Sequence, residues 1–60
     1  MYWNYDQIER DIRMGFDVRW VNDSYTCLVD NLGKFLVNWE DKNYLPLTAL
    51  RLSGFYIKEN

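Results

Sequence analysis

The sequence predicts an α+β fold in which an N-terminal helix packs on an antiparallel β-meander of three to four strands. Apolar residues recur at helical spacing near the start of the chain, and from residue 16 onward they alternate with polar residues instead. The chain is also short, and 60 residues form one domain at most. We therefore expect residues 1–60 to make a single compact domain, with a short helical turn near residues 46–53.

The helix is expected to begin after Asn4. Tyr5, Ile8 and Ile12 recur at i, i+3 and i+7, and charged residues fill the opposite side. Asn4 is a residue type that caps helix N-termini well, and Gly15 stands just past the last periodic position, where a left-handed residue commonly ends a helix. The charged side is interpreted as a solvated helix face.

The alternating part predicts three strands, over residues 16–21, 24–30 and 34–40, joined by turns at Asn22-Asp23 and Asn31-Leu32-Gly33. These turn lengths fix the register, because a slip of one residue moves every side chain to the other face. Nine residues then share one face in three cross-strand rows: Trp20-Tyr25-Trp39, Val18-Cys27-Val37 and Phe16-Val29-Phe35. We expect the helix to lie on this face and Cys27 to be a buried apolar residue.

The last third of the chain allows more than one interpretation. Leu45-Pro46 argues against a central strand, because proline cannot donate to a ladder, and Pro46 suits the first turn of a short helix that stops near Gly54. Residues 55–57 then form a short strand. The competing interpretation is a hairpin arm over residues 47–52. The alternative fold is a small SH3-like barrel with a 3₁₀ connector, but the mostly polar outer face favours an open sheet.

Composition excludes most catalytic chemistry. The chain has no His, a single Cys and acids that are scattered except for Glu40-Asp41, so it lacks a nucleophile paired with a base and the usual zinc ligands. We predict no enzyme activity, no cofactor and no metal. A formal net charge of −2, with basic residues interleaved among acids, makes nucleic acid an unlikely partner; a nucleic-acid-binding regulator is kept as an alternative.

The row Trp20-Tyr25-Trp39 has two interpretations. Three rings in register are what an aromatic cage for a methylated ammonium or a peptide side chain requires, as in a Tudor-type barrel. They are also what a 60-residue chain needs to fill its core, and this is the interpretation we favour. In the same way, the N-terminal aromatics Tyr2 and Trp3 are either a staple against the helix or exposed anchors for a partner.

Association with a protein partner is the function that the residues favour. The candidate partner-binding residues are those left over by the predicted core: Tyr2, Trp3, Leu28, Leu36, Glu40, Asp41 and Tyr44. Leucines at positions 45, 47, 50 and 52 are also more than one element is expected to bury. We predict a small non-enzymatic protein-binding modulator whose partner is a host protein or a second copy. A homo-oligomeric structural subunit is the remaining alternative.

In size and composition the chain resembles the small accessory proteins of phages and mobile elements. That resemblance implies an inhibitor that occludes a host protein, such as an anti-CRISPR or other anti-defence protein. Its start shows no basic region followed by an apolar stretch, and no uncharged run is long enough for a membrane span. We therefore expect a cytoplasmic protein with no membrane partner, located in the host cell cytoplasm if it is phage-encoded.

Overall fold

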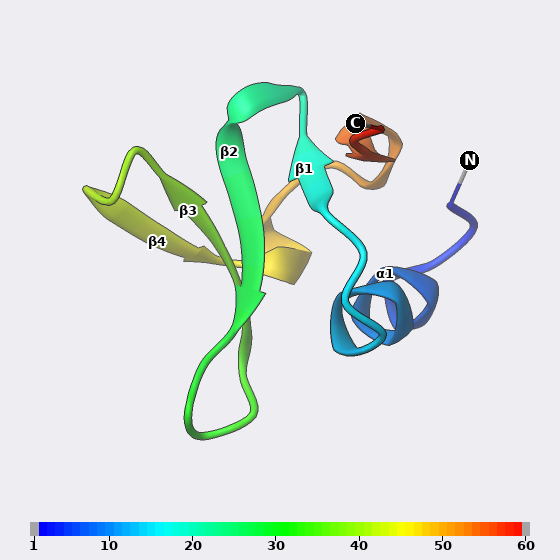
Figure 1. Ribbon diagram of the computed structural model, residues 1–60, viewed down its shortest axis with the longest axis horizontal. Coiled ribbons are helices and arrows are strands. Elements are labelled where there is room, and N and C mark those ends of the chain that lie inside the picture. Colours follow the sequence, from blue (N-terminus) through cyan, green and yellow to red (C-terminus); the bar gives the residue numbers. More distant parts are fainter. Residues whose placement is uncertain (1, 60) are drawn as a thin grey trace.

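The computed structural model describes residues 2–59. One helix is followed by five strands, with two 3₁₀ turns before the last strand (Figure 1). The elements are α1 Tyr5–Arg13, β1 Val18–Trp20, β2 Asn22–Val29, β3 Phe35–Trp39, β4 Asn43–Pro46, η1 Leu47–Ala49, η2 Leu52–Gly54 and β5 Phe55–Ile57. No helix within the described range has the length and apolar character that crossing a membrane requires.

Helix α1 begins and ends where the sequence predicts. The Asn4 side chain accepts a hydrogen bond from the Gln7 N–H at 3.0 Å, and the Gln7 side chain accepts one from the Trp3 N–H at 2.7 Å. One of the unpaired N–H groups of the first helical turn is therefore satisfied, and the Gln7 side chain ties the residue before the N-cap to that turn. At the other end Met14 is the C-cap and Gly15 follows with a φ of +91°, a conformation that glycine adopts without strain.

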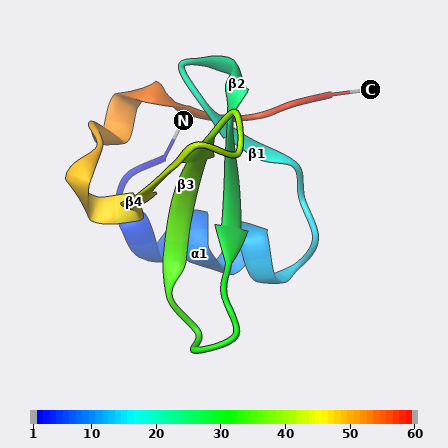
Figure 2. The same cartoon turned by 90° about the vertical axis from the view of Figure 1, so that its left-hand side faces the viewer.

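All strand pairs in the sheet are antiparallel, and the spatial order is β4-β3-β2-β1-β5. Helix α1 lies behind β2 and β3 in Figure 2 and covers one face of the sheet. The fold is thus the predicted helix on an open antiparallel sheet, but the sheet has five strands and not three to four. The register predicted between β2 and β3 is confirmed, with Cys27 opposite Val37 in the middle row.

The two strands at the edges complete the sheet. β4 includes Leu45 and Pro46, which the sequence had excluded only from a central strand, and an edge is where proline is tolerated. The strand predicted over residues 55–57 is confirmed as β5, and it pairs with β1 after the 3₁₀ turns, a partner that the sequence did not indicate. However, no ladder joins β4 to β5 among residues 2–59, so the sheet stays open. The hairpin arm over residues 47–52 is wrong, because η1 and η2 occupy that segment.

The connection between β1 and β2 differs from the predicted two-residue turn. Val21 adopts a φ of +65° and β2 already begins at Asn22. Arg19 pairs with Thr26 as the predicted register requires, whereas Trp20 pairs with Asn22, so the register shifts between the two. A β-branched residue in the left-handed region is costly, and no pattern in the sequence indicates it.

The core lies between α1 and the sheet. Its buried residues are Ile8, Val18, Val37, Leu47 and Phe55. Two of the nine residues predicted to share the inner face, Phe16 and Val29, are instead exposed. The Phe16 N–H donates to the Asp11 carbonyl at 3.1 Å and its carbonyl accepts from the Val18 N–H at 3.0 Å, so the backbone at Phe16 turns and does not enter the β1–β2 ladder. Val29 pairs with Phe35 as predicted but is exposed at the end of β2.

The leucines of the last third are mostly accommodated. Leu47 is buried, and Leu50 and Leu52 are half-buried against the core. No single element has to bury all four leucines, because they are distributed over β4, η1, η2 and the segment between the two 3₁₀ turns. Leu45, on β4, is the exposed member of this group.

Candidate functional site

The face of the sheet that points away from α1 is here called the outer face. Because side chains alternate along each strand, the register places one row of residues across all five strands on that face. The row runs Tyr56, Arg19, Thr26, Asn38 and Tyr44, from β5 to β4. A second row, Leu28, Leu36 and Pro46, lies beside it on β2, β3 and β4.

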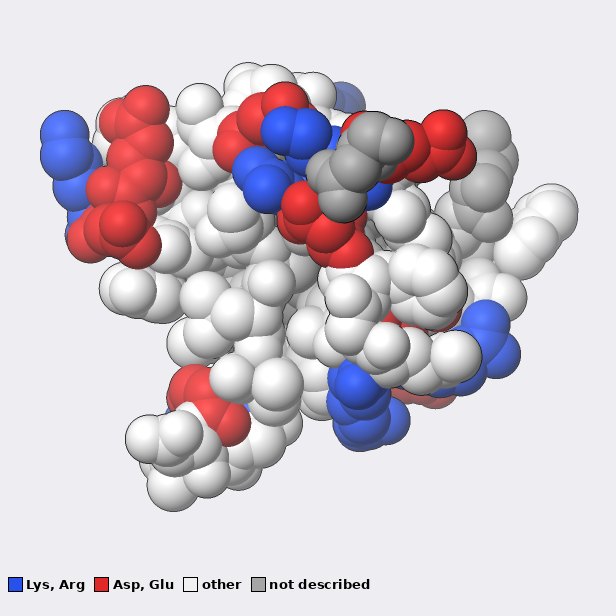
Figure 3. Space-filling view, in the orientation of Figure 1, with Lys and Arg blue, Asp and Glu red and all other residues white. Residues whose placement is uncertain are grey.

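The half of the outer face on β2, β3 and β4 carries no charged side chain in these rows. We call it the outer patch; its residues are Thr26, Leu28, Leu36, Asn38, Tyr44 and Pro46. Tyr44 is 55% exposed, Pro46 is exposed, and Leu28 and Leu36 are half-buried. Figure 3 shows charged side chains of both signs along the upper rim of the molecule and an uncharged area below them over β2 and β3.

Asn38 is the unusual member of the outer patch. It is only 7% exposed, and its Nδ2 donates to the Asp41 carboxylate at 2.8 Å. Its Oδ1 is buried and has no hydrogen-bond partner within the described part of the chain. An unpaired buried acceptor costs about 1–3 kcal/mol. The side chain therefore secures the turn that follows β3 at some expense in stability.

That turn joins β3 to β4 in a left-handed conformation. Glu40 and Asp41 have φ of +51° and +59°, and the Lys42 N–H donates to the Trp39 carbonyl at 2.9 Å. Positive φ at both central positions defines a type I′ turn, in which glycine or asparagine is the usual choice. The Asn38 to Asp41 hydrogen bond compensates for part of this strain.

The backbone of β4 has one free edge. The Asp30 N–H donates to the Lys34 carbonyl at 2.9 Å and the Glu40 N–H to the Ser24 carbonyl at 3.3 Å, so even-numbered residues of β3 bond toward β2. Odd-numbered residues of β3 then bond toward β4, where they face Asn43 and Leu45. The N–H and C=O of Tyr44 consequently point outward, away from the sheet. All four residues of β4 are exposed.

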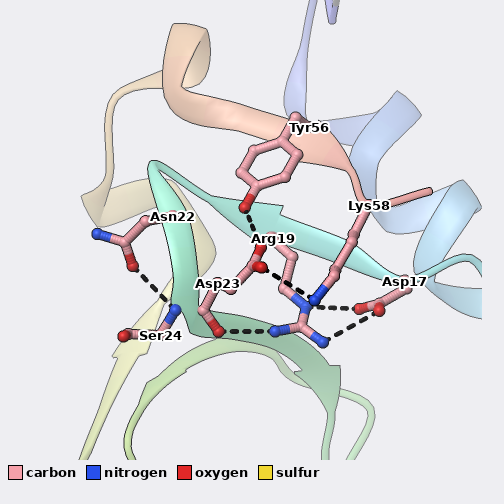
Figure 4. Close-up of polar contacts among 7 residues, drawn as sticks. All are labelled: Asp17, Arg19, Asn22, Asp23, Ser24, Tyr56 and Lys58. Carbon is pink, nitrogen blue, oxygen red and sulfur yellow. Dashed lines mark hydrogen bonds and ion pairs between the residues drawn. The ribbon is translucent and has the colours of Figure 1, made fainter. Parts of the chain in front are cut away.

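The other half of the outer face is occupied by an ionic cluster on β1, the start of β2, and β5 with the residues after it (Figure 4). Its residues are Asp17, Arg19, Asp23, Tyr56 and Lys58. The Arg19 guanidinium donates to both oxygens of the Asp17 carboxylate, from Nε at 2.7 Å and from Nη2 at 3.0 Å, and its Nη1 donates to the Asp23 carbonyl at 2.6 Å. The Asp23 carboxylate accepts from the Tyr56 hydroxyl at 2.6 Å and pairs with Lys58 at 2.9 Å.

The ionic cluster shifts the pKa of its members in the directions that these contacts dictate. The hydrogen bond from Arg19 lowers the pKa of the Asp17 carboxyl, and the hydrogen bond from Tyr56 followed by that from Lys58 lowers the pKa of the Asp23 carboxyl. The same contacts raise the pKa of Arg19 and of the Tyr56 hydroxyl. Every group is thereby held in its ordinary charge state, as in a cluster that fastens β5 to the sheet.

The two N-terminal aromatics behave differently. Tyr2 is half-buried against the core, and its hydroxyl donates to the Asp11 carboxylate at 2.6 Å. Burial, and after it the hydrogen bond to Asp11, raises the pKa of Tyr2 above its ordinary value. Tyr2 is thus the staple that the sequence allowed. Trp3 is 80% exposed and remains available as an anchor.

Two rings of the aromatic row on the inner face, Trp20 and Tyr25, pack against the core, whereas the Lys42 ammonium lies 6.0 Å from the centroid of the Trp39 ring. The rings of Trp20 and Tyr25 meet edge to face at 5.1 Å, and Tyr25 and Trp39 lie 6.4 Å apart. The Trp20 Nε1 donates to the Arg51 carbonyl at 3.0 Å, which ties this ring to the segment before η2. The neighbouring Cys27 is half-buried, and burial raises the pKa of its thiol to about 12. It therefore lacks the thiolate character of a reactive cysteine.

A groove of about 720 Å³ lies at the end of β4, between α1 and the turn end of the β2–β3 hairpin, where Gly33 and Lys34 line it. Its apolar lining comes from Phe35, Leu36, Pro46 and Leu47, and Tyr44 stands at its margin. The charged side chains that line it are Glu9, Arg13 and Lys34. Arg13 lies over the Phe35 ring at 5.0 Å and 3.9 Å from Glu9. No group of three or more potential metal ligands gathers among residues 2–59.

The structure brings together five of the seven candidate residues. Leu28, Leu36 and Tyr44 belong to the outer patch, and Glu40 and Asp41 form the turn beside it. Tyr2 and Trp3 lie apart, at the start of α1. The burial of Asn38 was not predicted from the sequence. The one signal for it is that alternation places Asn38 on the same face of its strand as Leu36. It also missed the ionic cluster, because nothing local links Asp23 to Tyr56 and Lys58.

The fold and the site together define a small α+β protein with an open antiparallel sheet and an uncharged outer patch in which Tyr44 and Pro46 are exposed. Comparison of the chain with protein-family models, with curated proteins and with solved structures finds no significant match.

Proposed function

We propose that this chain is a non-enzymatic protein-binding module that acts by occupying the surface of a partner protein. The observation that carries the proposal is the outer patch with the free edge of β4 beside it. Tyr44 presents a 55% exposed ring on the patch and an outward-facing backbone at the edge. Tyrosine is one of the residue types that dominate binding energy at protein interfaces.

The charge pattern supports a protein partner over a nucleic acid. The six residues of the outer patch are uncharged, and the turn next to it contributes Glu40 and Asp41. A surface of this kind has no cation at its centre to attract a phosphate, and the basic residues beside it, Lys42, Arg13 and Lys34, are accompanied by acidic ones. It suits the interface composition of proteins, in which charged residues are depleted at the centre and lie at the rim. Stoichiometric occlusion of a host protein, as by an anti-CRISPR or other phage-encoded anti-defence inhibitor, is the use we propose for it.

The proposal is tested by affinity capture from a host lysate with three forms of the immobilised chain: wild type, Tyr44→Arg, and Leu32→Arg as the matched control. Leu32 is 82% exposed at the tip of the β2–β3 hairpin, so both variants add the same charge at an exposed residue. We expect one protein bound at a one-to-one ratio by wild type and Leu32→Arg and lost with Tyr44→Arg. Equal capture by all three forms contradicts the assignment to the outer patch.

Native mass spectrometry separates the homodimer from a foreign partner. A second copy that binds through the same surface produces a wild-type dimer that Tyr44→Arg dissociates. A wild-type chain that stays monomeric at low micromolar concentration restricts the partner to another protein.

A further inference from the structure

We infer that the partner of the outer patch supplies an extended segment that pairs antiparallel with β4 and places an acidic side chain in the groove at the end of that strand. This inference rests on the proposed function and names the chemistry of the partner. It combines the direction of the Tyr44 backbone, the position of the groove and the charge of its lining.

The free edge of β4 is short, and its two ends differ in the hydrogen bonds that they can make. The N–H and C=O of Tyr44 point outward, whereas Pro46 has no N–H to offer. An added strand therefore forms its backbone hydrogen bonds around Tyr44 and cannot extend the ladder through Pro46. Addition of a strand to an exposed sheet edge is a recurrent mode of peptide recognition, in which the backbone supplies affinity and side-chain pockets supply specificity.

The groove begins at Pro46, where the hydrogen-bond ladder between β4 and an added strand has to end. Pro46, Leu47 and Thr48 line it from the end of β4 and from η1, and Phe35 and Leu36 line it from β3. A segment that runs along β4 past Tyr44 reaches this groove with its next residues, so an apolar side chain is buried against Phe35 and Leu36. In an antiparallel arrangement these residues precede the paired part of the segment in the partner's sequence.

The charges of the groove select an acidic residue. Two cations, Arg13 and Lys34, line it together with one anion, Glu9. Glu9 lies 3.9 Å from Arg13, and no carboxylate pairs with the Lys34 ammonium among the ion pairs of residues 2–59. The groove is therefore net positive although the whole chain is net negative. A carboxylate between Arg13 and Lys34 is attracted to both.

The probe is an acetylated and amidated hexapeptide, Glu-Leu-Thr-Val-Thr-Val, titrated into the ¹⁵N-labelled chain and observed by NMR. Its control replaces the Glu by Lys. We expect shifts of the Tyr44 and Leu36 amides, and binding of the control peptide at least about threefold weaker, as two partly exposed charge contacts imply. The difference should shrink as salt is added. No shift of the Tyr44 amide at millimolar peptide, or equal binding of the two peptides, overturns the inference.

The matched variants are the double substitution Arg13→Gln with Lys34→Gln, and Arg51→Gln as a charge control outside the groove. The double variant should bind the two peptides equally, and Arg51→Gln should still prefer the acidic one. In the capture experiment, a partner that is lost with Tyr44→Arg but retained by the double variant preserves the proposed function and refutes the acidic segment. A partner that is captured equally by wild type and by Tyr44→Arg refutes the proposed function itself.

Discussion

Two tyrosines stand at opposite ends of one cross-strand row, and their surroundings differ. Tyr56, on β5, donates its hydroxyl to Asp23 at 2.6 Å within the ionic cluster. Tyr44, on β4, is 55% exposed, and its hydroxyl makes no hydrogen bond to any other described residue. The same sheet thus has one edge fastened by side chains and one edge left open.

The difference between the two edges indicates that the β5 edge contributes to stability and the β4 edge to binding. The β5 edge is attached to residues distant in sequence, and it contributes Phe55 to the core. The β4 edge contributes Leu45 to the surface and is joined to β3 by a strained turn. We expect substitutions at the first edge to cost stability and those at the second to cost binding.

The largest expected difference compares Phe55→Ala with Tyr44→Ala. Phe55 is buried and meets the Tyr5 ring edge to face at 6.3 Å, so its truncation should cost about 3–5 kcal/mol of unfolding free energy. Truncation of the exposed Tyr44 should cost about 0.5 kcal/mol or less. Urea denaturation followed by tryptophan fluorescence measures both. Similar losses for the two variants would show that the edges do not divide stability and binding in this way.

The second prediction concerns the close approach of Gly54 to Trp20. A Cβ added at Gly54 would lie 2.5 Å from the Trp20 Nε1, which donates to the Arg51 carbonyl. Gly54→Ala should therefore displace the ring and cost about 1–3 kcal/mol. Ser53→Ala, at the exposed neighbouring residue, is the control and should be nearly neutral. A Gly54→Ala protein as stable as the control would mean that Trp20 is not fixed in this position.

A smaller effect on the unfolding free energy is expected when the pH is changed. In the folded protein the pKa of Asp23 lies below its ordinary value of 3.8, so the folded state binds fewer protons than the unfolded state near that pH. The contribution is complete above pH 3.8 and is lost as pH falls toward the folded pKa. The pKa of Tyr56 is raised, so its contribution is complete below pH 10.0 and is lost as pH rises further.

Denaturation curves at pH 3 and pH 7 measure the acid side of this effect. Asp23→Asn should reduce the difference between the two curves, whereas Glu40→Gln, at the open edge, should leave that difference unchanged. Equal pH dependence of wild type and Asp23→Asn would show that the contacts of Asp23 are not its source and would leave Asp17 as the remaining carboxyl of the cluster with a lowered pKa.

The smallest expected effect is an increase in the unfolding free energy, caused by Glu40→Gly. Glu40 has a φ of +51°, a conformation that costs a side-chain-bearing residue about 1–2 kcal/mol and glycine much less. Part of that gain is offset because glycine is more flexible in the unfolded chain. Glu40→Gly should therefore raise the unfolding free energy by about 0.5 kcal/mol in urea titrations. A loss of stability would indicate that the Glu40 side chain makes a contribution that outweighs the strain.

The sequence predicts those parts of the fold in which spacing and local chemistry agree. Apolar spacing placed the helix, and the three-residue loop ending at Gly33 fixed the pairing of Cys27 with Val37. The positive φ of Val21 and Glu40 was not predictable, because both residue types disfavour that conformation and tertiary contacts impose it. Phe16 was misplaced because its backbone hydrogen bonds turn the chain before β1 begins.

The candidate site was predictable only in part. Leu28, Leu36 and Tyr44 could be chosen because alternation sets them opposite the core. Their combination into one patch required residues 43–46 to form an edge strand, which the sequence did not predict because Leu45-Pro46 argued only against a central strand. The burial of Asn38 and the groove near Arg13 depend on how separate elements meet, and such contacts leave no local pattern.

The pairing of β5 with β1 also has a consequence for how the protein folds. It closes a loop that contains β2, β3 and β4, whereas each of those strands pairs with a neighbour reached through a short turn. Closing the longer loop costs more chain entropy, so the four-strand meander of β1 to β4 is expected to form first and β5 to dock afterwards. In native-state hydrogen exchange the β5 amides should then open below the global unfolding free energy, while the strand edge around Tyr44 persists in the partly opened molecule.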